Sequence, residues 1–338
     1  MKDYLQLCPH VDAVASWNTL FDRMTSRRLG ARTPSFRGKG ALQRLTRAVQ
    51  GWRYRCDVAL LPVRSPTSDM HDVMKGIVAR KRYGISGDTT NQSEPCDTAA
   101  DTVYTARLDV GSEHRWQHEI VTTKRFLEML GVIVDDDLWP EVWLDSHDRE
   151  WAATRVPARQ GGVLTLGLCP GVTSHMRKFY SGERIRDALA AVNEQRFSVV
   201  VLGSPPEREM CRQVADAVVD CPNVDGVVNL AGSSTVRQMA ATLDACDVVL
   251  AQETAALHLA VALNKPTVGI VGGGHWRRFY PWGTAARNRS AHLRMDCFGC
   301  NWQCIYETAR CIQDLRPAAL ARELRVALSS SPGGSRVD

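Results

Sequence analysis

The sequence predicts an α/β protein with two domains, each organised around a doubly wound parallel sheet. Short apolar, β-branched runs alternate with helical patterns along the 338 residues, and this alternation is typical of parallel sheets. A chain of this length can also bury two separate cores. We expect a first domain over residues 1–158, a second over residues 159–328, and a disordered tail over residues 329–338 that is rich in Ser and Gly.

The first domain is expected to combine helices and strands up to a linker at residues 156–162, which holds one proline and two glycines. Helical spacing of apolar residues predicts helices over residues 41–55, 70–80, 118–130 and 145–154. Short apolar runs predict strands over residues 56–63, 82–85 and 139–144. The polar stretch between residues 86 and 104 is expected to form a surface loop.

After the linker the alternation restarts with a more regular spacing. Apolar runs predict strands over residues 163–168, 198–202, 227–230, 248–250 and 267–271. Helical patterns separate them over residues 183–193, 207–219, 235–245 and 255–263. Polar residues come directly after several of these strands, and open α/β sheets bind ligands at the carboxyl ends of their strands.

The most informative stretch is residues 248–282, which reads as strand, helix, strand and Gly-rich loop. It brings Glu253, Thr254 and His258 close together at a turn and on the first turns of the following helix. Gln252 to Ala260, QETAALHLA, with KPTV after it at residues 265–268, resembles the donor-site signature of the heptosyltransferases, glycosyltransferase family 9. That family usually shows Asp-Thr-Gly, two residues and then His, so Glu253 and Ala255 stand in the places of Asp and Gly.

The resemblance covers residues 160–328 closely and residues 1–150 loosely. It implies a GT-B-like architecture of two Rossmann-like domains, with a nucleotide-diphospho-sugar bound by the second. It further implies a metal-independent, inverting transfer of a sugar such as heptose to a glycan or lipopolysaccharide-type acceptor held by the first. Glu253 and Thr254 would contact the donor sugar and phosphate, Ala255 would stand beside them, and His258 would donate to a phosphate oxygen. For a lone histidine on an Ala/Leu-rich helix, the alternative is a core side chain.

The loop after the first strand of the second domain supplies candidate phosphate ligands. A turn at this position points backbone N–H groups and the positive end of a helix toward an anion. Thr173 and Ser174 add hydroxyl donors and Lys178 adds a cation that could neutralise a leaving diphosphate. The stretch resembles the family's hydroxyl pair and subsequent Lys-x-Trp, with Tyr180 in the Trp place. The alternative is a capped loop with a surface lysine.

Three further turns are candidates for the nucleotide pocket. Gly203 and Glu207 close the second strand, and Glu207 resembles the family's acidic residue on the ribose, although it could instead be a helix N-terminal carboxylate. Gly232 lies in a Gly-Ser turn that resembles the pocket lining and also reads as an ordinary N-cap. Gly273, in the triple-glycine loop at residues 272–274, allows close approach to a ligand or forms a turn without contact.

Four cysteines near the C-terminus form a second group of interest, Cys297, Cys300, Cys304 and Cys311. Four thiols within fifteen residues suit a tetrahedral metal or a cluster, and the spacing resembles cysteine clusters of several relatives. We expect one structural Zn or Fe per chain and no catalytic metal. Two disulfides or four free thiols are the alternatives.

The general base that the family carries early in its first domain has no evident counterpart. The segment YLQLCPHVD at residues 4–12 resembles the part of the family's first domain that comes after its Gly-rich turn and Asp. We therefore expect a first domain that lacks that strand and turn. Either the chain is a truncated form, or an acid elsewhere substitutes, for which Asp69 and His71 are the nearby candidates. A non-catalytic sugar-nucleotide-binding or scaffold relative is the alternative to an active transferase.

Composition narrows the class of protein further. The net charge of +5 is modest, but eight basic residues gather between residues 23 and 47, as a solvated face or as a contact for anionic lipid headgroups or phosphorylated glycans. No motif accompanies them that would indicate a nucleic-acid partner. Without a signal peptide or an apolar run of about 20 residues, the expected location is cytoplasmic, with peripheral contact to the inner membrane face as an option.

Overall fold

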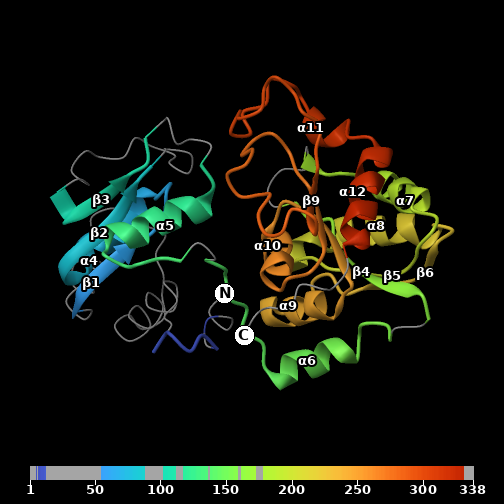
Figure 1. The fold of residues 1–338 in the computed structure, drawn as a ribbon, viewed down its shortest axis with the longest axis horizontal. Helices are drawn as coiled ribbons and strands as arrows, with labels where there is room; N and C mark the ends of the chain where they lie inside the picture. The colour runs from blue at the N-terminus through green and yellow to red at the C-terminus, as the bar shows by residue number, and fades with distance from the viewer. Residues whose placement is uncertain are drawn as a thin grey trace, which may run out of the picture. The chain divides into compact units, whose positions relative to one another are not determined.

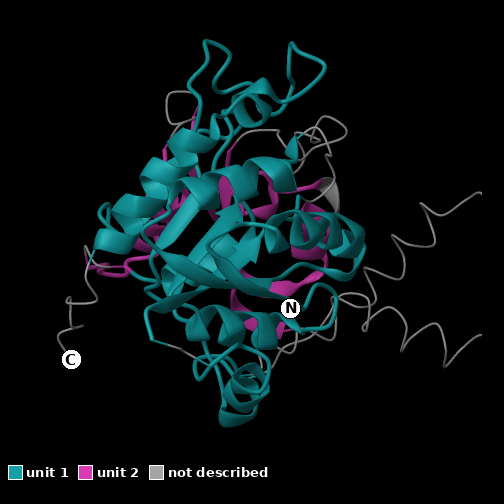
Figure 2. Cartoon of the chain, turned by 90° about the vertical axis from the view of Figure 1, so that its right-hand side faces the viewer, with its two compact units in different colours: residues 1–16, 139–338 teal, residues 17–138 magenta. Residues whose placement is uncertain are grey.

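A computed structural model describes residues 5, 7–12, 55–87, 102–111, 117–135, 138–158, 161–172 and 178–330 (Figure 1). The chain forms two compact units, one of residues 17–138 and one of residues 1–16 and 139–338 (Figure 2). The sequence placed the domain boundary after residue 158, whereas the structure divides the chain after Leu138. Residues 139–158 join the second half because Trp139 Nε1 donates to the carbonyl of Ala262 at 3.0 Å.

Helix α6 (Ser146–Ala153) explains the rest of this shift in the boundary. Asp145 caps it, and Arg237 of α9 (Val236–Ala245) forms ion pairs with both Asp145 and Asp148. Asp148 is buried, so its charge is stabilised by that pairing. The helix predicted over residues 145–154 is thus confirmed, while residues 139–144, predicted as a strand, have no regular structure.

The larger unit contains a six-stranded sheet in which every adjacent pair is parallel. Its strands are β4 (Val163–Cys169), β5 (Arg196–Val201), β6 (Val224–Asn229), β7 (Val248–Gln252), β8 (Thr267–Ile270) and β9 (Asn288–Ala291). The strand order is β6-β5-β4-β7-β8-β9, the doubly wound order of a Rossmann sheet. The direction of winding reverses between β4 and β7, which is where such sheets bind ligands.

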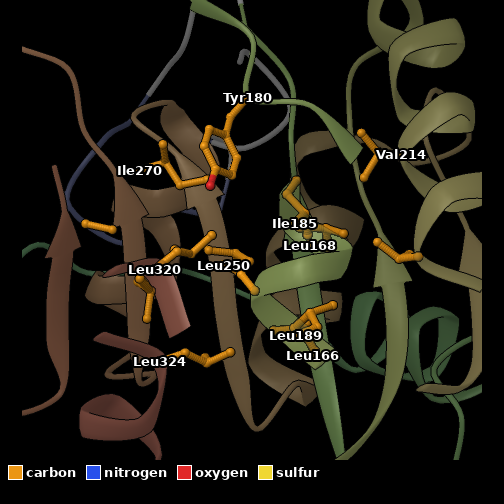
Figure 3. Close-up of a cluster of buried hydrophobic side chains, with 14 of the residues drawn as sticks. Leu166, Leu168, Tyr180, Ile185, Leu189, Val214, Leu250, Ile270, Leu320 and Leu324 are labelled. Carbon is orange, nitrogen blue, oxygen red and sulfur yellow. The ribbon is translucent and has the colours of Figure 1, made fainter. Parts of the chain in front are cut away.

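Helices cover both faces of this sheet (Figure 1). On one face lie α7 (Gly182–Ala191), α8 (Arg208–Val219) and α12 (Pro317–Ser329), and on the other lie α9 and α10 (Ala255–Ala262). Figure 3 shows the first interface, where Leu189 and Leu324 pack against Leu166 and Leu250. Each such side chain contributes about 1.5–3 kcal/mol on full burial, so the two buried faces hold the sheet rigid beneath the loops.

The smaller unit contains a three-stranded parallel sheet of order β1-β2-β3, formed by β1 (Arg55–Leu61), β2 (Val78–Ser86) and β3 (Ala106–Asp109). Its helices are α4 (Ser68–Gly76) and α5 (Glu119–Met129). The helix predicted over residues 70–80 is wrong at its C-terminal end, because residues 78–80 belong to β2. Val78 pairs with Arg55 of β1, and this strand pairing overrides the local helical spacing.

Several predictions fall on parts of the chain that the structure does not describe. They include most of the helix over residues 41–55, most of the loop over residues 86–104, the basic stretch and residues 331–338 of the tail. Within the described residues, no helix is long and apolar enough to cross a membrane.

Candidate functional site

The predicted site residues belong to loops that leave β4, β5, β6, β7 and β8 at the carboxyl edge of the sheet. Two of these loops are tied together where the winding reverses, because Gln252 Nε2 donates to the carbonyl of Pro170 at 2.8 Å. The sequence alone could not show this link, because the two residues are 82 positions apart. Thr173 and Ser174 lie outside the described residues.

Glu207 stands at the end of the short helix η4 (Pro205–Glu207) that comes after β5. Its Oε2 accepts from the Ser204 N–H at 2.7 Å and from the Ser204 hydroxyl at 2.6 Å. Its other oxygen lies against Gly171, where an added Cβ would collide with it. The carboxylate therefore caps the short helix, in agreement with the alternative that the sequence left open. It also lies at the edge of the sheet where β4 and β5 end.

Gly203 and Gly232 lie beside it, at the ends of β5 and β6. The Gly232 N–H donates to the Gly203 carbonyl at 2.8 Å. Gly232 has a φ of 70°, which favours glycine, and an added Cβ there would collide with Arg208. Arg208 itself donates to the Gly232 carbonyl at 2.6 Å. Thr235 caps α9, so the turn also serves as the N-cap that the sequence allowed.

Glu253 comes directly after β7 and is the most unusual acid of the site. Its Oε1 is buried and, among the described residues, has no hydrogen-bond partner. Burial raises the pKa of Glu253 to about 8, and the Lys178 ammonium lowers it in part. The carboxyl group is therefore mainly protonated at pH 7, when it can donate a hydrogen bond as well as accept one.

Lys178 occupies the same part of the site, as its electrostatic effect on Glu253 shows. Its Nζ lies 3.6 Å from the ring centroid of Trp302, a residue that the sequence interpretation did not single out. Tyr180, which stands in the place of the family's Trp, is instead fully buried and its hydroxyl donates to the carbonyl of Leu315 at 3.1 Å. No local pattern around Lys178 could have identified Trp302, since Trp302 belongs to the cysteine-containing segment, far away in the sequence.

His258 is held by a second tryptophan that the sequence did not indicate. Trp282 Nε1 donates to His258 Nδ1 at 2.9 Å, and the two rings are stacked with centroids 6.2 Å apart. An indole N–H can only donate, so the facing ring nitrogen must be unprotonated. Neutral His258 therefore carries its proton on Nε2, the form in which it can donate to an oxygen.

Thr254 and Ala255 begin α10. Thr254 occupies the N-cap position, but its side chain makes no capping hydrogen bond. Ala255, in the place of the family's Gly, is exposed on the first turn. The positive end of the helix dipole is thus at the same edge as Lys178 and Glu253.

Gly273 is buried, and the space that its missing side chain leaves is filled by Phe298. Its carbonyl accepts from the Gly299 N–H at 2.7 Å, and its own N–H points to Cys311 Sγ at 3.4 Å. The absence of side chains in the triple-glycine loop therefore lets the C-terminal segment pack closely against it. A contact between Gly273 and a donor stays a prediction.

The four cysteines are free thiols in one neighbourhood. Burial raises the pKa of Cys300, and the nearby thiols of Cys304 and Cys297 raise it further. Among the described residues, the potential metal ligands whose donor atoms all lie within 4.8 Å of one another are Asp145, His147 and Asp148. No three of the four thiols are that close together. Their positions therefore do not present a ready tetrahedral cage.

The two candidates for a general base, Asp69 and His71, lie in α4 of the smaller unit. The side chain of Asp69 is outside the described residues. His71 is 3% exposed, and its Nδ1 lies 2.8 Å from the hydroxyl of Tyr104. This is the environment of a packed side chain, and a role as base stays a prediction.

The doubly wound sheet, with acidic, basic and glycine residues gathered at its reversal point, defines the class of Rossmann-like α/β proteins. The chain belongs to a particular family within that class. A profile of glycosyltransferase family 9 (heptosyltransferase) matches residues 104–305, which confirms the family predicted from the signature around Glu253.

Individual relatives agree. Lipooligosaccharide heptosyltransferase 2 of Campylobacter jejuni is 24% identical over 172 residues, covering 49% of this chain and 52% of that protein. Lipopolysaccharide heptosyltransferase 2 of Escherichia coli K12 is 22% identical over 135 residues, covering 40% of this chain and 38% of that protein. The chain thus spans about half the length, or less, of the curated relatives it matches.

Solved structures confirm the fold class. The ADP-heptose LPS heptosyltransferase II of E. coli aligns with a TM-score of 0.58 at 17% identity, over 85% of this chain and 80% of that chain. A family 9 glycosyltransferase of Veillonella parvula aligns with a TM-score of 0.64 at 13% identity, over 98% of this chain and 87% of that chain. Similarity at this level of identity supports the GT-B-like architecture and no finer property.

Proposed function

We propose that the larger unit binds a nucleotide-diphospho-sugar and that the protein transfers the sugar, with heptose as the first candidate, to a glycan or lipopolysaccharide-type acceptor. The observation that carries the proposal is that a cation, Lys178, acts electrostatically on the buried carboxyl of Glu253 at the reversal point of the sheet. A cation there can neutralise a diphosphate leaving group. A protonated carboxyl beside it can accept from sugar hydroxyls and donate to a phosphate oxygen.

The other residues fit the same ligand. Glu207, beside the Gly203 and Gly232 turns, is proposed to accept from the vicinal hydroxyls of a ribose. His258, with its proton on Nε2, can donate to a phosphate oxygen, and Thr254 and the N-terminus of α10 lie next to it. Thr173 and Ser174 are proposed as hydroxyl donors in the same loop as Lys178.

The first test is a calorimetric titration with ADP, GDP and UDP. We expect at least one nucleoside diphosphate to bind with a dissociation constant below the millimolar range. The nucleoside with the same base, adenosine in the case of ADP, should bind more weakly. No heat of binding for any diphosphate at millimolar concentration would contradict the proposal.

Turnover is a separate question, because general-base help is worth about 10²–10⁴ in rate. Donor hydrolysis and transfer to a lipopolysaccharide-type acceptor should be measured with ADP-heptose. Binding without turnover would favour the alternative, a sugar-nucleotide-binding relative that lacks the base. The Asp69→Asn variant, with His71→Gln as its matched partner, tests whether either side chain serves as the base.

We also propose that Cys297, Cys300, Cys304 and Cys311 hold a structural Zn or Fe. The spacing of four thiols in one short segment supports the site, while the separation of their sulfur atoms requires side-chain rearrangement before a metal could bind. Elemental analysis of protein purified without added metal should find one equivalent per chain. A metal content near zero would leave them as free thiols.

A further inference from the structure

The Lys178 ammonium lies directly over an aromatic face of the cysteine loop, which we define as residues 296–304. The 3.6 Å between Nζ and the Trp302 ring centroid is well inside the roughly 6 Å limit for cation–π attraction. Tryptophan offers the strongest such attraction among the aromatic side chains. The lysine that would meet the donor phosphates is thus held by a residue far from it in the sequence.

The Trp302 ring is itself fixed in place. Its Nε1 donates to His275 Nδ1 at 3.3 Å, and the ring lies so close to Gly272 and Gly274 that a Cβ at either position would collide with it. The Asn301 N–H donates to the Gly274 carbonyl at 3.0 Å. The Trp302 indole therefore packs directly on the triple-glycine loop after β8.

An indole face differs from a carboxylate as a partner for the lysine. Glu253 lies within electrostatic range of Lys178 and carries a buried oxygen with no hydrogen-bond partner among the described residues. An ion pair between the two would neutralise the ammonium. The indole attracts the cation through its ring face and carries no charge of its own, so this contact does not neutralise the ammonium.

We propose that Trp302 is a positioning residue that holds Lys178 for the diphosphate, which makes the cysteine loop a working part of the donor site. This inference rests on the proposed function. It assigns a role to a segment that the sequence singled out for its thiols alone, and the role does not depend on whether those thiols bind a metal.

The test compares the affinities of ADP and adenosine for the wild type and three variants by calorimetry. Trp302→Leu is expected to weaken ADP binding about tenfold, in line with a partly desolvated cation–π contact, and to leave adenosine binding unchanged. Trp302→Phe retains a π face and should stay within about threefold of the wild type. Trp276→Leu is the matched control, because Trp276 packs on Phe298 with centroids 5.0 Å apart in the same aromatic group.

A double-mutant cycle separates positioning from general structural damage. In a Lys178→Met background, Trp302→Leu should cause no further loss of ADP affinity. An equal loss in both backgrounds, or an equal loss in Trp276→Leu, would overturn the inference.

Should Trp302→Leu fail to fold, Trp302→Met replaces it in the double-mutant cycle, because its longer, flexible side chain fills more of the space and still lacks a π face. It should weaken ADP binding about tenfold in the wild-type background and cause no loss in the Lys178→Met background, and an equal loss in both backgrounds would overturn the inference. Failure of the wild type to bind any diphosphate is distinct from these outcomes, because it refutes the proposed function before a variant is made.

Discussion

The two ends of the candidate site are built in different ways. At the Glu207 end, the carboxylate, Ser204 and Gly203 lie within five residues of one another, and the hydrogen bonds of the carboxylate are those of a local cap. At the Glu253 end, the carboxyl is buried with an unpartnered oxygen, and its neighbour Lys178 is held by Trp302 from a distant segment.

The difference shows at which end of the candidate site unfavourable burial lies. A satisfied, solvated carboxylate costs little to maintain and suits recognition of a neutral ribose. An unsatisfied buried carboxyl beside a cation is costly, and such groups cluster at functional sites. We therefore expect variants at the Glu253 end to change stability, pH dependence and phosphate binding, and variants at the Glu207 end to change nucleoside recognition.

The largest effect is expected from Glu253→Gln. The pKa of about 8 exceeds the ordinary value of 4.5, so the folded protein keeps a proton that the unfolded chain releases. Wild-type stability should therefore fall as pH rises from about 4.5 to about 8. The loss of unfolding free energy reaches about 4 kcal/mol near pH 8. The variant cannot ionise at this position and should not show that loss.

Urea denaturation at pH 5, 6, 7 and 8 measures this difference. The variant's stability relative to the wild type should increase steadily across the series. A difference that stays constant with pH would show that the carboxyl does not titrate in this range.

Lys178→Met should weaken the binding of ADP and of inorganic pyrophosphate by about 10- to 100-fold, the worth of hydrogen bonds to a charged group. Lys265→Met is the control, because Lys265 pairs with Asp244 at 3.7 Å at the opposite edge of the sheet. Calorimetry should show unchanged ADP affinity for the control. Equal affinities for both variants would remove Lys178 from the site.

Glu207→Ala should weaken ADP binding about tenfold through the lost ribose contact while leaving pyrophosphate binding as it was. Ser204→Ala, which removes one hydrogen bond to the same carboxylate, should cost less. If Glu207→Ala also weakened pyrophosphate binding, the division of the site into two ends would be wrong.

The smallest effect is expected from Trp282→Phe, which keeps the stacking on His258 and removes the donor to Nδ1. The imidazole can then adopt either tautomer, and ADP affinity should fall about two- to fivefold, the net worth of one hydrogen bond. The ¹⁵N chemical shifts of the ring should show Nε2 protonated in the wild type and a mixture in the variant. Trp139→Phe, which alters the neighbouring indole without touching His258, should leave those shifts unchanged.

Much of the larger unit could be predicted from the sequence because its determinants are local. The buried strands read as apolar runs of the right length, and the Glu207 cap and the signature around Glu253 are contiguous. The prediction missed β9 and β3, whose NRSA and ARLD sequences carry polar residues. It also extended a helix into β2, where pairing with β1 decides the structure.

The sequence by itself determined the family, the doubly wound sheet and the turns that carry Glu207, Glu253 and His258, since each depends on residues adjacent in the chain. Only the tertiary structure decided the charge state of Glu253 and the partners of Lys178 and His258. Burial, cation–π contact and tautomer choice depend on what packs around a side chain, and Trp302 and Trp282 arrive there through the fold.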